Sequence, residues 1–120
     1  MTELIQTLKK IAELDGGFLT IWQYQKTTLY NFKTKSRGVE CDSVDLGKAS
    51  CQDLIFGAIC EKVEAEGWFC EFETRKIKPK YNFTVYTGHS CYHSKYSHEN
   101  LTTAAAKALL AALEAKQVKT

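Results

Sequence analysis

Proline and glycine are scarce in this chain of 120 residues, which has one proline and seven glycines. That leaves little room for a disordered linker, and no low-complexity tract occurs. There is no apolar run of roughly 18 to 20 residues, the length that a membrane-spanning helix needs. The first ten residues, MTELIQTLKK, are charged and amphipathic and do not have the pattern of a signal peptide. We therefore expect one soluble domain over residues 1–120, no membrane partner and a cytoplasmic location.

Catalytic and metal-binding motifs are also missing. The chain has no nucleophile elbow, no phosphate-binding glycine loop and no paired-carboxylate motif, and its five cysteines include no CxxC pair. In an intracellular protein these cysteines are expected to be reduced, and Cys51, Cys60 and Cys70 to be buried as small hydrophobic residues. We predict no catalytic residue, no cofactor and no metal. The net charge of +2 makes nucleic acid a less favoured partner than a protein or a small nucleotide.

Apolar periodicity predicts an α+β fold in which an antiparallel β-sheet meander packs against helices, in the order α-ββ-α-βββ-α. The expected helices cover residues 2–15, 50–66 and 101–116; the expected strands are two in 18–36, then 68–76, 80–87 and 91–97. A turn, with a short strand as an alternative, is expected after residue 37.

Several local signals support these boundaries. Ser50–Asp53 has the form of a capping box for the second helix. The buried stripe expected on this helix is Cys51, Leu54, Ile55, Ala58, Ile59 and Val63. Asn100 or Thr102 is expected to cap the last helix, whose alanines and leucines favour helix strongly.

The hairpin IWQYQKTTLYNFKTKSR is the first candidate surface. Four rings are predicted to crowd one face and to interleave with basic side chains; the residues are Trp22, Tyr24, Tyr30, Phe32, Lys33, Lys35 and Arg37. Rings beside cations stack bases and hold phosphates. The same residues would also suit a structural core or an interface with a partner or a second copy. All three alternatives remain open from the sequence.

The second candidate surface is the outward face of the three later strands. Strand alternation directs Trp68, Cys70 and Phe72 to the core. It leaves a polar face that includes Glu71, Arg75, Tyr86, His93 and Lys95. We interpret this face as a solvated surface that is open to a ligand or a partner.

The stretch TGHSCYHSKYSHEN holds all three histidines, and His89, Cys91 and His93 alternate within it. Imidazole and thiolate suit zinc, and a Cys–His pair suits nucleophilic catalysis. On a flat strand, however, side chains four residues apart lie roughly 13 to 14 Å apart, too far for one ion. A metal- or cysteine-dependent enzyme at these residues is therefore an alternative rather than the main hypothesis.

Two resemblances bear on function. The second half has the α-β-β-β-α order of double-stranded RNA-binding domains, although only Lys107 is basic where that family carries a lysine cluster. A nucleic-acid-binding module is therefore a second alternative.

The segments DLIFGAICEKVEAEGWFCEF and YHSKYSHENLTTAAAKALLAALEA are similar to the phage ABA sandwich family, in about the second half of the chain. That resemblance implies an α-β-α layered fold, a viral origin and the host cytoplasm, and it implies no reaction. The main hypothesis is a non-enzymatic accessory protein that inhibits a host defence factor or sequesters a small nucleotide. A homodimer would cover the aromatic surface.

Overall fold

The computed structural model of the chain describes residues 2–35, 38–88 and 93–118. Within these residues the chain forms three helices and two three-stranded antiparallel sheets, so the predicted α+β class is confirmed. The elements are α1 (Thr2–Leu14), β1 (Leu19–Tyr24), β2 (Thr27–Lys33), β3 (Gly38–Asp42), α2 (Ala49–Ala65), β4 (Phe69–Thr74), β5 (Tyr81–Tyr86), β6 (His93–His98) and α3 (Leu101–Val118). The short strand weighed as an alternative to a turn is β3.

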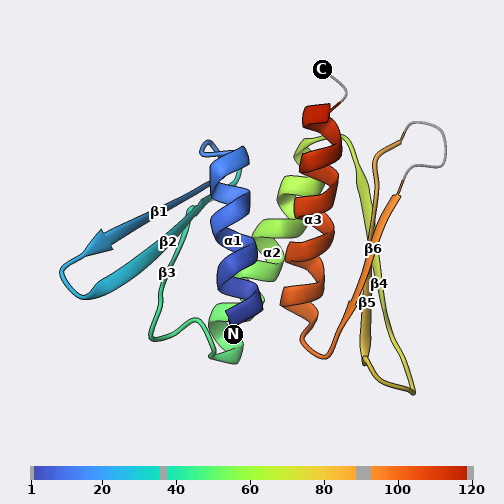
Figure 1. Cartoon of the computed structure of the whole chain (residues 1–120), viewed down its shortest axis with the longest axis horizontal. Helices are drawn as coiled ribbons and strands as arrows, with labels where there is room; N and C mark the ends of the chain where they lie inside the picture. The colour runs from blue at the N-terminus through green and yellow to red at the C-terminus, as the bar shows by residue number, and fades with distance from the viewer. Residues whose placement is uncertain (1, 36–37, 89–92, 119–120) are drawn as a thin grey trace.

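Helices form the middle of the molecule, with one sheet on either side (Figure 1). The β1–β2–β3 sheet packs against α1 and α2, whereas β5 and β6 pack against α3. α2 also reaches β4, and α3 contacts both other helices. The layers therefore run sheet, helices, sheet, which differs from the α-β-α layering that the phage-family resemblance implies. Each sheet buries one face and leaves the other at the surface.

The helical layer is dense because α3 is rich in alanine. Ala104, Ala105, Ala106, Ala108 and Ala112 have at most 1% of their surface exposed. Such small side chains let neighbouring elements approach closely, so that little empty space remains between them. None of the described helices has the length and apolar character that a membrane crossing requires.

Two predictions about α2 are wrong. Ser50 does not cap the helix, because the helix begins at Ala49 and Ser50 already lies inside it; the N-cap is Lys48, which makes no side-chain capping bond. Leu54 was expected to be buried but is 42% exposed. It is rotated by about 100° from fully buried Ile55 and lines an open hollow beside β2 and β3.

The predicted faces of the first hairpin also need correction. β1 and β2 pair so that Ile21 lies opposite Tyr30 and Trp22 lies opposite Leu29. Directly paired residues of an antiparallel ladder share a face. Tyr30 therefore lies on the inner face with Ile21, while Trp22 lies on the outer one. The prediction that all four rings of the hairpin share a face is wrong.

Polar contacts fix the ends of the helices. Asn100 caps α3, as expected: its Oδ1 accepts from the backbone N–H of Thr103 at 2.8 Å, and its amide donates to Oε1 of Gln52 in α2 at 2.7 Å. On β6, the buried hydroxyl of Ser94 donates to the carbonyl of Ala108 at 2.8 Å. These contacts hold α3 against α2 and against the second sheet.

Candidate binding face on the second sheet

The outer face of the β4–β5–β6 sheet is a regular grid of side chains. Cross-strand pairing produces three rows, which are Phe69–Tyr86–His93, Glu71–Thr84–Lys95 and Glu73–Asn82–Ser97. Side chains of one row stand about 5 Å apart, and neighbouring rows lie about 7 Å apart. We call these nine residues the outer grid. It consists of a row of rings, a charged row and a polar row.

Hydrogen bonds fix the carboxylates of the grid. The Tyr86 hydroxyl donates to Oε1 of Glu71 at 2.5 Å, and the Asn82 amide donates to Oε1 of Glu73 at 2.7 Å. The Ser97 hydroxyl donates in turn to Oδ1 of Asn82. Both carboxylates on edge strand β4 are thus held by donors on central strand β5. Each retains lone pairs that can accept further donors.

The rings make one end of the grid apolar. Phe69 is 70% exposed, and the rings of Tyr86 and His93 are 5.9 Å apart at 40°. In the central column, Asn82 and Thr84 are only 6% exposed, because both lie on the central strand with side chains of the two edge strands on either side. The hydrogen bond to Glu71 raises the pKa of the Tyr86 hydroxyl, since losing the proton would place two negative charges together.

A shallow hollow lies over the grid. Its volume is about 380 Å³, and seven of its lining residues belong to the outer grid. At neutral pH the formal charges on its walls are those of Glu71, Glu73 and Lys95, two negative and one positive, with His93 taken as neutral. The hollow is therefore acidic and open, and it combines carboxylates with aromatic surface.

The structure brings together most of the residues predicted for this face. Glu71, Tyr86, His93 and Lys95 all belong to the outer grid. Arg75 does not, because it lies beyond the end of β4 in the turn, where its backbone N–H donates to the carbonyl of Lys80 at 2.6 Å. The sequence reading missed Phe69. The same alternation that places Glu71 outward also places Phe69 there.

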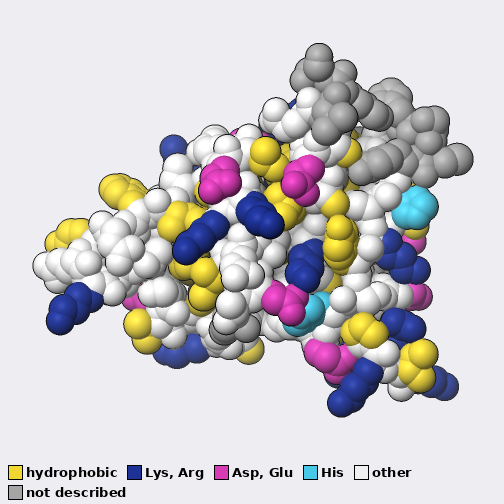
Figure 2. Space-filling view, in the orientation of Figure 1, with side chains coloured by type: hydrophobic (Ala, Val, Ile, Leu, Met, Phe, Trp, Pro, Cys, Tyr) yellow, Lys and Arg dark blue, Asp and Glu magenta, His cyan; other side chains and the backbone are white. Residues whose placement is uncertain are grey.

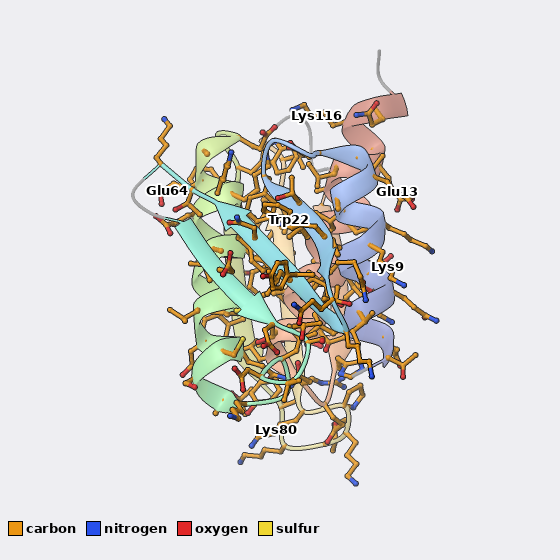
Figure 3. All side chains as sticks on the ribbon, turned by 90° about the vertical axis from the view of Figure 1, so that its left-hand side faces the viewer. Lys9, Glu13, Trp22, Glu64, Lys80 and Lys116 are labelled. Carbon is orange, nitrogen blue, oxygen red and sulfur yellow. The ribbon has the colours of Figure 1, made fainter. Side chains whose placement is uncertain are left out.

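The predicted aromatic and basic cluster of the first hairpin does not assemble. Tyr30 and Phe32 are 2% and 0% exposed and lie in the core, where no ligand reaches them. Trp22 and Tyr24 are 58% and 66% exposed on the outer face of the sheet. Figure 2 shows hydrophobic side chains on this protruding hairpin, and Figure 3 looks onto the face that carries Trp22.

The predicted basic residues Lys33 and Lys35 lie away from the exposed rings. Lys33 and Lys35 line a separate hollow with Asp15 and Lys62, at the end of β2. Lys33 is four residues along β2 from Leu29, the partner of Trp22, which is about 13 Å. Arg37 lies outside the described residues. Lys33 and Lys35 are thus separated from the exposed rings of Trp22 and Tyr24, whereas Lys26 lies in the turn next to Tyr24.

The structure describes only part of the site that a metal- or cysteine-dependent enzyme would use. His93 belongs to the outer grid, whereas His89 and Cys91 lie outside the described residues. Among the residues that the structure describes, no group of three or more His, Cys, Asp or Glu side chains is placed to hold a metal ion.

No family model matches this sequence, and comparisons with curated proteins and with solved structures find no match either. The resemblance to the phage ABA sandwich family therefore stays a prediction. The side chains of the outer grid therefore provide the basis for a proposed function.

Proposed function

We propose that the protein is a non-enzymatic binder that takes a basic segment of a partner protein on the outer grid. The observation that carries this proposal is the pair of carboxylates, Glu71 and Glu73, fixed by donors from β5 next to an exposed row of rings. Arginine matches both parts, because its guanidinium binds carboxylates through paired hydrogen bonds and also stacks on aromatic faces.

Charge favours a basic protein segment over a nucleotide. The rings of Tyr86 and His93 would stack a base, but a phosphate would have to approach Glu71 and Glu73, and among the described residues that line the hollow Lys95 is the one lysine or arginine. The open shape points the same way, since small ligands favour clefts that cover most of their surface. Nucleotide sequestration therefore ranks second, and a nucleic-acid-binding module ranks third.

The biological setting of this proposal comes from the resemblance to phage proteins. On that basis the partner is a host protein, met in the host cytoplasm, and binding would inhibit it. The aromatic anchors and the paired carboxylates are the features that protein interfaces commonly use to hold arginine.

A peptide titration followed by NMR tests the proposal. The ¹⁵N-labelled protein is titrated with three flexible peptides of equal length that carry arginine, lysine or aspartate at one central position. We expect the arginine peptide to bind most tightly and to shift the amides of β4, β5 and β6. The double variant Glu71→Gln/Glu73→Gln should weaken binding at least about tenfold, the worth of one charge-assisted hydrogen bond.

Glu13→Gln is the matched control, because Glu13 is an exposed carboxylate on α1, away from the grid (Figure 3). It should leave arginine-peptide affinity unchanged. Tighter binding of a nucleoside monophosphate than of the arginine peptide, with the same amides shifted, would replace this proposal by nucleotide sequestration. Peptide-induced shifts confined to the β1–β2–β3 sheet would move the binding site to the other face.

A homodimer through the exposed rings of Trp22 and Tyr24 is a separate prediction, because aromatic side chains are enriched at interfaces. Native mass spectrometry reports the subunit count directly. If the protein is a monomer at micromolar concentration, the prediction of a homodimer through Trp22 and Tyr24 is wrong.

A further inference from the structure

Four of the five cysteines lie in the described residues as free thiols. Cys51 and Cys60 both belong to α2 and are nine residues apart. Nine residues are about 2.5 helical turns, so the two side chains point to opposite sides of the helix. Because α2 lies between the two sheets, each thiol meets a cysteine of a different sheet. Cys51 contacts Cys41 of β3, and Cys60 contacts Cys70 of β4.

The Cys60–Cys70 pair is close and reachable. Cys60 of α2 and Cys70 of β4 lie next to each other where these two elements pack, so that the two thiols interact. Both residues are partly exposed, because β4 is an edge strand of its sheet and leaves this side open. A reagent in solution can therefore reach a sulfur that already has a second sulfur beside it.

The Cys41–Cys51 pair has the same helix-to-sheet arrangement but a different environment. Its residues are 4% and 7% exposed. Burial, followed by the hydrogen bond to Cys51, raises the pKa of Cys41 to about 12. The hydrogen bond from Cys60 instead lowers the pKa of Cys70 to about 7 and raises that of Cys60. Since the thiolate is the reactive form, the lowered pKa favours Cys70 as the attacking sulfur of its pair.

We propose that Cys60 and Cys70 are an oxidisable dithiol, which hydrogen peroxide converts into an intrachain disulfide between α2 and β4, while Cys41 and Cys51 stay reduced. The Cys70 thiolate attacks a peroxide oxygen, the O–O bond breaks and hydroxide leaves, which gives a sulfenic acid. The Cys60 sulfur then attacks the Cys70 sulfur; the S–S bond forms and the S–O bond breaks. Two thiols and one peroxide give one disulfide and two waters.

This modification site is independent of the proposed binding function, but it lies next to the binding face. Cys70 stands on the inner side of β4 between Phe69 and Glu71, which belong to the outer grid. A disulfide at Cys70 would hold this part of the edge strand against α2.

Oxidation followed by disulfide mapping tests the inference. The Cys91→Ser variant serves as parent, so that only the four described cysteines remain. It is treated with hydrogen peroxide near neutral pH, the remaining thiols are blocked by alkylation, and linked peptides are identified by mass spectrometry. We expect the Cys60–Cys70 link to form at least about tenfold faster than a Cys41–Cys51 link, and dithiothreitol to reverse it.

Two serine variants define the roles of the sulfurs. Cys60→Ser should leave a sulfenic acid on Cys70 that dimedone traps, whereas Cys70→Ser should abolish the fast reaction with peroxide. Random linkage among the four cysteines, or an equally fast reaction in Cys70→Ser, would overturn the proposal. Circular dichroism checks that both variants fold. If they do not fold, disulfide mapping on the parent still shows whether the Cys60–Cys70 link forms first.

Discussion

The two sheets have the same strand arrangement but differ in the side chains on their solvent-facing sides. Each is a three-stranded antiparallel meander with its inner face on the helices. The outer face of the β1–β2–β3 sheet carries Trp22 and Tyr24, both more than half exposed. The outer face of the β4–β5–β6 sheet carries carboxylates that are hydrogen-bonded to neighbours across the strands.

The comparison distinguishes side chains that the fold requires from side chains that the fold does not require. Packing against the helices decides the inner faces, because a buried polar group without a partner would cost free energy. This constraint is weaker on the outer faces, where most side chains meet water. An exposed hydrogen bond contributes little to stability, and ordering its side chains costs conformational entropy. The exposed bond between Tyr86 and Glu71 therefore adds little to folding, which is consistent with the proposed recognition role of this face.

The largest expected effect contrasts the inner and outer rings of the first hairpin. Phe32→Ala should lower the free energy of unfolding by about 3–5 kcal/mol, because it leaves a cavity in the core. Trp22→Ala should change it by less than about 1 kcal/mol, because an exposed side chain is removed. Urea unfolding followed by circular dichroism measures both. Equal losses in the two variants would contradict the assignment of Trp22 to the outer face.

Strand alternation in the second sheet could be predicted from the sequence, whereas the first sheet could not. Pro79 and Gly88 mark the turns between β4, β5 and β6, and along β5 the apolar residues Tyr81, Phe83 and Val85 alternate with Asn82 and Thr84. In the first hairpin the turn is Gln25–Lys26, with Gln25 at φ of 56°. No Asn-Gly or Asp-Gly pair indicates that turn, so the register remained open. The rings of β1 lie on the outer face and those of β2 on the inner face, so the position of a ring does not indicate which face is buried.

The candidate site was predictable only within a single strand or helix. Alternation along β4 determines that Phe69 and Glu71 share a side, and the helical period determines that Cys51 and Cys60 do not. Which residues of other elements they meet depends on long-range pairing, which the sequence pattern does not encode locally. The separation of Lys33 from Trp22 and the Cys60–Cys70 contact are of this kind.

The second prediction concerns the helical layer that supports both sheets. Lys62 of α2 is 12% exposed, and its Nζ lies 2.6 Å from Oδ2 of Asp15 and 2.9 Å from Oε2 of Glu66. Lys62→Met should lower the free energy of unfolding by about 1–3 kcal/mol at neutral pH, because Asp15 loses its cation. Hydrogen exchange should become faster in both sheets together, since both rest on the same layer.

The pH dependence of this effect has a defined sign. Burial would raise the pKa of Asp15 and of Glu66, but hydrogen bonds from lysines outweigh it and lower both. A lowered pKa stabilises the fold above the unfolded values, 3.8 for Asp15 and 4.5 for Glu66, and this stabilisation is lost as the pH falls through the folded values. The difference between Lys62→Met and the parent should therefore shrink in acid. An undiminished difference at pH about 2, well below those values, would show that the methionine disturbs packing instead.

The last prediction concerns the smallest and most local effect on stability. It asks whether hydrogen bonds hold the side chains of the outer grid in place. Because the pKa of Tyr86 is raised, its bond to Glu71 is fully present below the unfolded tyrosine pKa, near 10, and is lost as the pH rises through the folded pKa. Subtracting the ultraviolet titration of Tyr86→Phe from that of the parent isolates this hydroxyl. Glu71→Gln should lower its pKa toward 10, whereas Glu73→Gln, whose carboxylate instead accepts from Asn82, should lower it less. Equal shifts in the two variants would mean that Tyr86 responds to the acidic charge of the whole face. Carboxylates fixed by hydrogen bonds would then no longer distinguish the outer face of the second sheet from that of the first.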